Sequence, residues 1–89
     1  MAARILVVDD LPINLQLISD ILEFRGHRID AAASLDEARK CLRAARPDLV
    51  LLDVQMPGGG GEVLLREIRA DPTLPALPVI AVTASEETR

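Results

Sequence analysis

Aromatic residues are almost absent from this 89-residue sequence, which contains one phenylalanine, Phe24, and neither tryptophan nor tyrosine. Proteins that bind single-stranded nucleic acid stack the bases on aromatic side chains, so this chain lacks the residues for such a surface. The net charge of −4 also argues against binding to a phosphate backbone. One loose basic cluster has helical spacing, and we interpret it as the solvated face of a helix: Arg39, Lys40, Arg43 and Arg46.

Cysteine and long apolar runs are also scarce. The single cysteine, Cys41, has no partner for an intrachain disulfide, which agrees with a reducing compartment. No stretch approaches the ~20 apolar residues that a membrane-spanning helix needs. The short apolar run at residues 5–8 is not followed by the cleavage site of a signal peptide. The sequence therefore predicts one small domain with a cytoplasmic location.

Three short apolar runs each end in a polar residue. They are residues 5–8 with Asp9 and Asp10, residues 49–52 with Asp53, and residues 78–82 with Thr83. Continuous apolar runs between more polar helical segments are typical of buried strands in a parallel sheet. Ligands of such sheets bind beyond the carboxyl ends of the strands. We therefore expect the closing polar side chains to meet at one edge of the sheet.

Helical patterns fill the segments between the runs, and Ser34 and Glu37 have the spacing of a capping box. Alternating strands and helices predict an α/β fold with a parallel sheet and helices on both faces. The strand before Ser34 is more polar than the others and is expected at an edge. The predicted elements are strands at 4–9, 27–32, 49–54 and 78–83, and helices from Pro12 to a stop at Gly26, from Ser34 to near Arg46, and at 62–70.

The three carboxylates of Asp9, Asp10 and Asp53 suggest a chemistry for this edge. Carboxylates held close together repel one another unless a cation lies between them. Mg²⁺ prefers oxygen ligands and commonly uses one or two carboxylates together with a phosphate oxygen. A carboxylate at such a site can attack phosphorus and form an acyl phosphate. The sequence therefore predicts a divalent-metal site that handles a phosphoryl group.

From residue 5 to residue 84 the sequence resembles the receiver domain of two-component response regulators. The matching segments are ILVVDD at 5–10, DLVLLDVQMPG at 48–58 and PVIAVTA at 78–84. The resemblance implies a doubly wound, flavodoxin-like (CheY-like) α/β fold with strand order 2-1-3-4. It also implies an incomplete receiver domain over residues 1–89, truncated before the fifth strand, because the family continues with a fourth helix, a fifth strand and a fifth helix.

The same resemblance assigns roles to the polar residues. Asp53 would be the phosphoacceptor, supplied by a histidine on a sensor kinase or a phosphotransfer protein. Asp53 and Asp10 would ligate Mg²⁺, Asp9 would do so directly or through water, and the backbone carbonyl of Gln55 would complete the protein ligands. Thr83 would turn its hydroxyl toward the phosphoryl group. The protein would be a signalling switch that catalyses its own phosphorylation and dephosphorylation, not an enzyme acting on a metabolite.

Two departures from the family pattern stand out. Gly60 replaces the acidic residue that usually follows the Met-Pro segment, and it belongs to a run of four glycines. Such a run could cradle a phosphate through its backbone N–H groups, although turn geometry is the more ordinary reason for glycine there. The family lysine at the end of the fifth strand has no counterpart, because the only lysine, Lys40, lies in the predicted second helix.

Two other functions compete with the switch. A truncated receiver could act as a docking or dimerisation module, because strand 78–83 would present an open edge and part of the stripe on the first helix would be exposed to water. Self-association through that strand or that helix would cover them. A metal-dependent phosphohydrolase with an aspartyl nucleophile is the third class. We discount it because such enzymes typically carry an acid two residues after the nucleophile, where this chain has Gln55.

Overall fold

Strands and helices alternate along the chain in a computed structural model that describes residues 2–53, 56, 60–74 and 76–82. The alternation agrees with the order predicted from the sequence. In chain order the elements are β1 (Arg4–Val8), α1 (Pro12–Phe24), β2 (Arg28–Ala32), α2 (Leu35–Ala44), β3 (Leu49–Asp53), α3 (Gly60–Ala70) and β4 (Val79–Val82).

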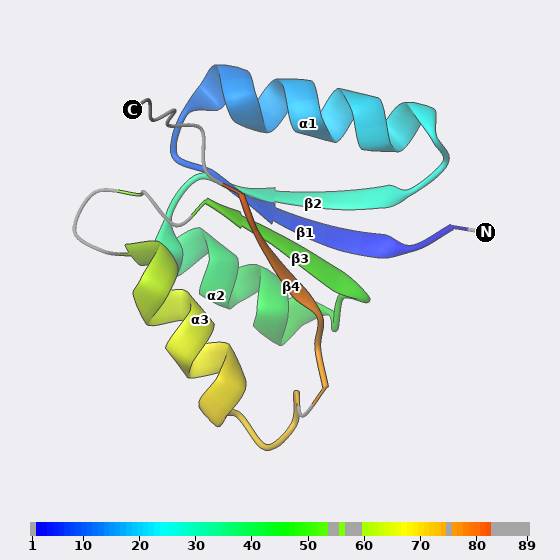
Figure 1. Ribbon diagram of the computed structural model, residues 1–89. Coiled ribbons are helices and arrows are strands. Elements are labelled where there is room, and N and C mark those ends of the chain that lie inside the picture. The colour runs from blue at the N-terminus through cyan, green and yellow to red at the C-terminus, as the bar shows by residue number, and fades with distance from the viewer. Residues whose placement is uncertain (1, 54–55, 57–59, 75, 83–89) are drawn as a thin grey trace.

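The four strands form one parallel sheet in the order β2-β1-β3-β4, which confirms the predicted fold class and strand order (Figure 1). The more polar β2 lies at an edge, as expected. The register pairs Val8 of β1 with Leu52 of β3, and Asp53 of β3 with Val82 of β4. The carboxyl ends of the central strands therefore lie side by side.

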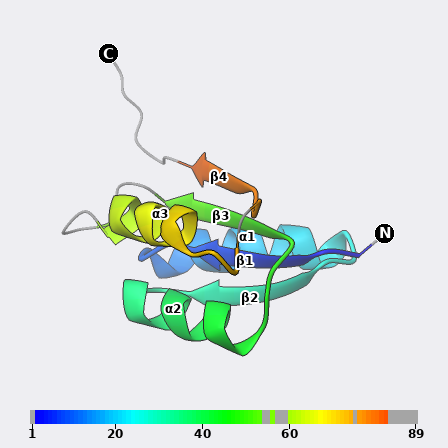
Figure 2. The same ribbon diagram turned by 90° about the horizontal axis from the view of Figure 1, so that it is seen from below.

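Helices cover the two faces of the sheet unequally. On one face α2 and α3 pack over a single apolar core, while α1 lies alone on the other face against β1 and β2 (Figures 1 and 2). Since strand side chains alternate between faces, Leu6, Val8, Val50 and Leu52 belong to the core under α2 and α3. All four side chains are at most 1% exposed. β1 is buried on both of its faces, which explains why its apolar run contains no polar residue.

Local signals set most helix boundaries. Pro12 occupies the first turn of α1, where its missing N–H removes no helical hydrogen bond. Gly26 follows the helix with φ of 93°, a conformation that glycine adopts without a steric penalty. At the start of α2, the Ser34 hydroxyl accepts a hydrogen bond from the Glu37 N–H at 3.1 Å. The Glu37 carboxylate in turn accepts the Ala33 N–H at 2.8 Å, so both residues of the predicted capping box bind exposed backbone donors.

Two predicted boundaries are wrong by two residues. The second helix ends at Ala44 rather than near Arg46, because Ala45 is extended, with φ of −159°. The third helix begins at Gly60, although glycines 60 and 61 were predicted to lie in a loop. Gly61 is buried in the first turn, and a Cβ on Gly60 would lie 3.7 Å from the terminal methyl of Met56. That separation is an ordinary van der Waals distance, so packing does not require glycine at this position, where helix propensity disfavours it.

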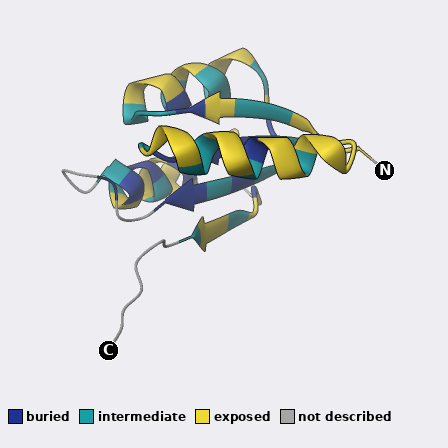
Figure 3. Ribbon diagram, turned by 90° about the horizontal axis from the view of Figure 1, so that it is seen from above, coloured by how far each residue is buried: buried dark blue, intermediate teal, exposed yellow. Residues whose placement is uncertain are grey.

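The outer face of α1 is unusually apolar. Ile13, Leu17, Ile21 and Phe24 are 53–89% exposed, and Figure 3 shows exposed residues along most of the helix. Its less exposed residues are buried Ser19 and half-buried Asn14, Leu15, Ile18 and Leu22. The prediction that part of the α1 stripe is exposed to water is confirmed for the described chain.

Candidate functional site at the carboxyl edge of the sheet

The strand register brings two of the predicted site residues together. Val8 pairs with Leu52, so one further step along both strands places Asp9 opposite Asp53. The Asp9 N–H still donates to the carbonyl of Ala32 at 3.1 Å, which shows that the pairing with the next strand continues through this residue. Neighbouring strands lie about 4.8 Å apart. The backbone pairing of the strands thus brings the two carboxylates next to each other.

Asp10 completes the cluster. One carboxylate oxygen from each of Asp9, Asp10 and Asp53 lies within 4.8 Å of the other two. Asp9 and Asp53 are buried, with exposed fractions of 5% and 6%, whereas Asp10 is half-buried. The prediction that these three carboxylates meet at one edge is borne out by the geometry.

A hydrogen bond fixes the position of the Asp9 carboxylate, and its surroundings disfavour its charged form. Its Oδ1 accepts the N–H of Leu11 at 2.9 Å, which fixes the carboxylate just before α1 begins. Burial raises the pKa of the Asp9 carboxyl above its ordinary value of 3.8, and the negative charges of Asp53 and Asp10 raise it further. The Leu11 hydrogen bond opposes these effects. The site therefore favours a positive charge, because a cation would remove the cause of the remaining repulsion.

The donor set of this cluster fits a hard divalent cation. All three groups offer carboxylate oxygens, the ligand type that Mg²⁺ prefers, and none offers sulfur or imidazole. Mg²⁺ usually keeps several waters, and the half-exposed Asp10 leaves one side of the cluster open to solvent. Asp9, Asp10 and Asp53 are therefore the residues that would hold the ion.

The remaining predicted site residues, Gln55 and Thr83, lie outside the described residues, as do residues 57–59 of the glycine-containing loop. Their roles as carbonyl ligand, switch hydroxyl and phosphate cradle stay predictions. Gly60 is described and lies in the first turn of α3.

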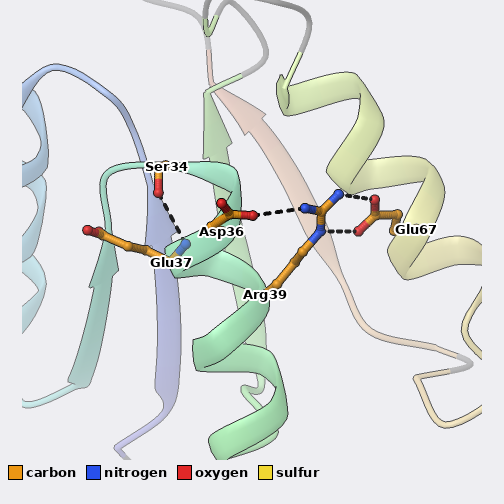
Figure 4. A network of polar contacts seen from close by, with 5 residues as sticks. All are labelled: Ser34, Asp36, Glu37, Arg39 and Glu67. Atoms are coloured by element: carbon orange, nitrogen blue, oxygen red, sulfur yellow. Dashed lines mark hydrogen bonds and ion pairs between the residues drawn. The ribbon is translucent and has the colours of Figure 1, made fainter.

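Sequence reasoning missed two contacts, one at this site and one between α2 and α3. The backbone N–H of Leu11 holds Asp9, and only the shortness of the Asp-Asp-Leu-Pro turn hinted at it. Arg39 does not simply face solvent. Its Nε and Nη2 donate to both carboxylate oxygens of Glu67 at 3.0 and 2.6 Å, and its Nη1 donates to Asp36 at 3.0 Å (Figure 4). Arg39 thus ties α2 to α3 from the solvated side of α2, a contact that the interpretation as a solvated face did not include.

The Glu67 contact raises the pKa of the Arg39 guanidinium, and the hydrogen bonds from Arg39 lower the pKa of Glu67. Both groups are therefore charged at neutral pH. Cys41, interpreted as a packing residue from the sequence, is half-buried against the core, and burial raises the pKa of its thiol. A raised thiol pKa agrees with an unreactive cysteine.

Within the part of the chain that the structure describes, no helix has both the length and the apolar character needed to cross a bilayer.

The protein is thus a parallel α/β domain with three carboxylates clustered at the carboxyl edge of its sheet, and comparison with known proteins gives the family. The family model for the response regulator receiver domain matches residues 5–89. The chain belongs to the response regulator receiver domain family.

Individual relatives agree with this assignment. Response regulator PleD of Caulobacter vibrioides is 41% identical over 86 residues, which span 94% of this chain but 18% of PleD. The N-terminal domain of a response regulator receiver protein from Methanoculleus marisnigri JR1 superposes with a TM-score of 0.87 at 40% identity, covering 97% of this chain and 70% of that one. Response regulator protein TrrA of Thermotoga maritima, solved in complex with Mg(2+)-BeF, gives a TM-score of 0.80 at 38% identity, covering 93% and 70%.

Proposed function

We propose that this chain accepts a phosphoryl group on Asp53 from a phosphohistidine of a sensor histidine kinase or a phosphotransfer protein. The observation that carries the proposal is the placement of buried Asp53 at the end of β3, with Asp9 and Asp10 within 4.8 Å. A carboxylate oxygen of Asp53 would attack phosphorus and form an O–P bond while the N–P bond breaks. The electron pair of that bond stays on the imidazole nitrogen of the donor.

The cluster supports a dependence on Mg²⁺. A bound Mg²⁺ would neutralise part of the charge that accumulates when a phosphoryl group meets three carboxylates. Asp9 and Asp10 would hold the ion together with Asp53, and the backbone carbonyl of Gln55 would add a fourth protein ligand. The likeness to TrrA, whose solved complex contains Mg(2+)-BeF, supports the same choice of ion.

The proposed role is that of a switch in the cytoplasm rather than an enzyme with a metabolite as substrate. Phosphorylation of Asp53 would bias the domain between two conformations that a partner distinguishes. Thr83, placed at the end of β4 by the sequence, would supply the hydroxyl that responds to the phosphoryl group.

Phosphorylation by a small donor tests the proposal. We expect acetyl phosphate with Mg²⁺ to add the mass of one phosphoryl group to the intact protein, and chelation of Mg²⁺ to prevent the addition. Asp53→Asn should abolish it, while Asp36→Asn, which removes an exposed carboxylate on α2, should leave it unchanged. A label that persists in the Asp53→Asn protein would place the phosphoacceptor elsewhere. Turnover of many equivalents of acetyl phosphate would indicate a phosphohydrolase instead.

A second candidate function is a docking or dimerisation module that does not switch. Exposed apolar residues favour it: Leu17 and Ile21 on α1 are 58% and 53% exposed, and Ile80 on β4 is 51% exposed. β4 also ends the sheet of described strands, so one of its edges is open there to pairing with another chain.

Sedimentation of the purified chain at micromolar concentration tests self-association. If α1 forms the contact, Leu17→Glu should convert a dimer to a monomer. Gln16→Glu, which adds the same charge at the neighbouring polar position, should not. A parent protein that sediments as a cooperatively folded monomer would exclude this candidate without affecting the phosphorylation proposal.

A further inference from the structure

A cleft of about 690 Å³ opens between α2 and α3 at the edge of the domain opposite to the carboxylate cluster. Both helices return antiparallel to the strands, so their carboxyl ends lie near the amino ends of the strands (Figures 1 and 2). The hydrogen bond from Asp48 N–H to the Arg4 carbonyl at 2.7 Å marks that edge of the sheet. The cleft is therefore separate from the phosphoacceptor site.

Apolar side chains form the inner part of the cleft. Leu64 and Ile68 of α3, Leu74 beyond it and Leu42 of α2 all line the cleft and all belong to or pack against the main core. A concave site that reaches core residues can bury an incoming apolar side chain, and volumes between about 300 and 1,000 Å³ are usual for binding sites. The cleft is large enough for one or two such side chains.

Some of the charged side chains that line the cleft have hydrogen-bonding partners, and others do not. Glu67 is bound by Arg39 on both carboxylate oxygens, and Asp71 accepts the N–H and the hydroxyl of Thr73 at 2.8 and 2.7 Å. The two acids of the lining thus already have partners.

Two arginines that line the cleft have no such partner among the described residues. Arg43 and Arg46 are exposed and make no hydrogen bond or ion pair with any described residue. Arg46 contributes, after the hydrogen bonds from Thr73, to the lowered pKa of Asp71, but it does not bind that carboxylate. Two guanidinium groups with unused donors therefore stand beside an apolar cleft, in a protein whose net charge is −4.

We propose that the α2–α3 cleft is a docking site for an acidic amphipathic segment of a partner protein, which inserts an apolar side chain between Leu42 and Leu74 and places carboxylates on Arg43 and Arg46. Guanidinium groups bind carboxylates through paired hydrogen bonds, and an amphipathic helix in a groove is a common mode of peptide recognition. A nucleotide fits less well, because no aromatic residue lines the cleft for a base to stack on.

A labelled peptide tests this site directly. The probe is a fluorescein-labelled peptide of about twelve residues, with leucines at helical i, i+4 spacing and glutamates on the other positions. The comparison peptide carries glutamine in place of every glutamate. We expect fluorescence anisotropy to show binding of the glutamate peptide that weakens as salt is raised, and about tenfold weaker binding of the glutamine peptide.

Two double variants that remove the same charge show which arginines bind the peptide. Arg43→Ala with Arg46→Ala should weaken the glutamate peptide about tenfold. Arg25→Ala with Arg66→Ala removes the same charge from exposed positions outside the cleft and should change the affinity less than about twofold. Equal weakening by both double variants, or equal affinity for the two peptides, would overturn the proposal.

Backbone amide shifts in ¹⁵N NMR spectra of the parent protein give a readout that does not depend on any variant. Shifts should concentrate at residues 42–46 and 71–74. Shifts confined to α1 would show that the leucines bind the exposed apolar helix instead, and would also overturn the proposal. The Asp53→Asn protein should bind the peptide as the parent does, so failure of the phosphorylation proposal would leave this one standing.

Discussion

Replacing Asp10 by asparagine should stabilise the metal-free protein. The oxygens of the three carboxylates lie within 4.8 Å of one another, and Asp10 therefore faces two negative neighbours. Two unit charges about 5 Å apart repel by roughly 0.8 kcal/mol in water and about 3 kcal/mol at the effective dielectric of a protein surface. Asp10 is half-exposed, and its charge also interacts favourably with the start of α1, an effect of about 0.3–1 kcal/mol.

The net gain for Asp10→Asn without metal is therefore about 1–2 kcal/mol. For a domain of this size that corresponds to a rise in Tm of about 4–16 °C. The same substitution removes one of the three carboxylates proposed to bind Mg²⁺, so Mg²⁺ should stabilise the variant much less than the parent. For the parent, Mg²⁺ at about a hundred times its Kd should add roughly 2.7 kcal/mol.

Urea denaturation followed by far-UV circular dichroism measures both effects, because the chain has neither tryptophan nor tyrosine for fluorescence. Each protein is unfolded once in EDTA and once in excess Mg²⁺. Glu23→Gln, which removes an exposed carboxylate on α1 away from the cluster, serves as the control and should change neither curve appreciably. Destabilisation of Asp10→Asn in EDTA, or an undiminished response to Mg²⁺, would refute the reasoning.

Three further predictions concern the scaffold. Leu64→Ala should lower the free energy of unfolding by about 2–5 kcal/mol in urea titrations, because the side chain is 1% exposed and its loss leaves a cavity. Ser34→Ala should cost about 1 kcal/mol in the same assay through loss of the hydrogen bond to the Glu37 N–H, whereas Ser34→Asp should retain most of it. Because Arg39 lowers the pKa of Glu67, the stabilisation from their contact is present above the ordinary pKa of 4.5 and is lost as pH falls through the lowered value. The Tm difference between the parent and Glu67→Gln should accordingly shrink below about pH 4, and a pH-independent difference would contradict this assignment.

Much of the fold was predictable because local and global signals agree. The apolar runs at 5–8 and 49–52 predicted buried parallel strands from their composition, and they form β1 and β3, the two inner strands of the described sheet. Pro12 and Gly26 mark the ends of α1 through backbone constraints that need no tertiary context. The carboxylate cluster was predictable for a related reason. The carboxyl ends of parallel strands lie at the same edge of the sheet, so acids that follow neighbouring strands lie close together.

Other features could not be predicted from local signals. The start of α3 at Gly60 opposes the low helix propensity of glycine, and a Cβ there would make only an ordinary contact with Met56. The contact of Arg39 with Glu67 could not be predicted because Glu67 is 28 residues away and on another helix. The cleft beside Arg43 and Arg46 arises from the same pairing of α2 with α3, and no spacing within α2 predicts it.

The pairing of β1 with β3 determines where an extra residue can be inserted without separating Asp9 from Asp53. Asp9 faces Asp53 because both strands keep the same side-chain alternation up to that point. One residue inserted within either strand would turn the following carboxylate to the opposite face of the sheet and separate the two acids. Insertions in the connections at 25–27 or 45–48 would leave the alternation intact. We therefore expect random insertion libraries to retain phosphorylation when the extra residue falls in these connections, and to lose it when the residue falls inside β1 or β3.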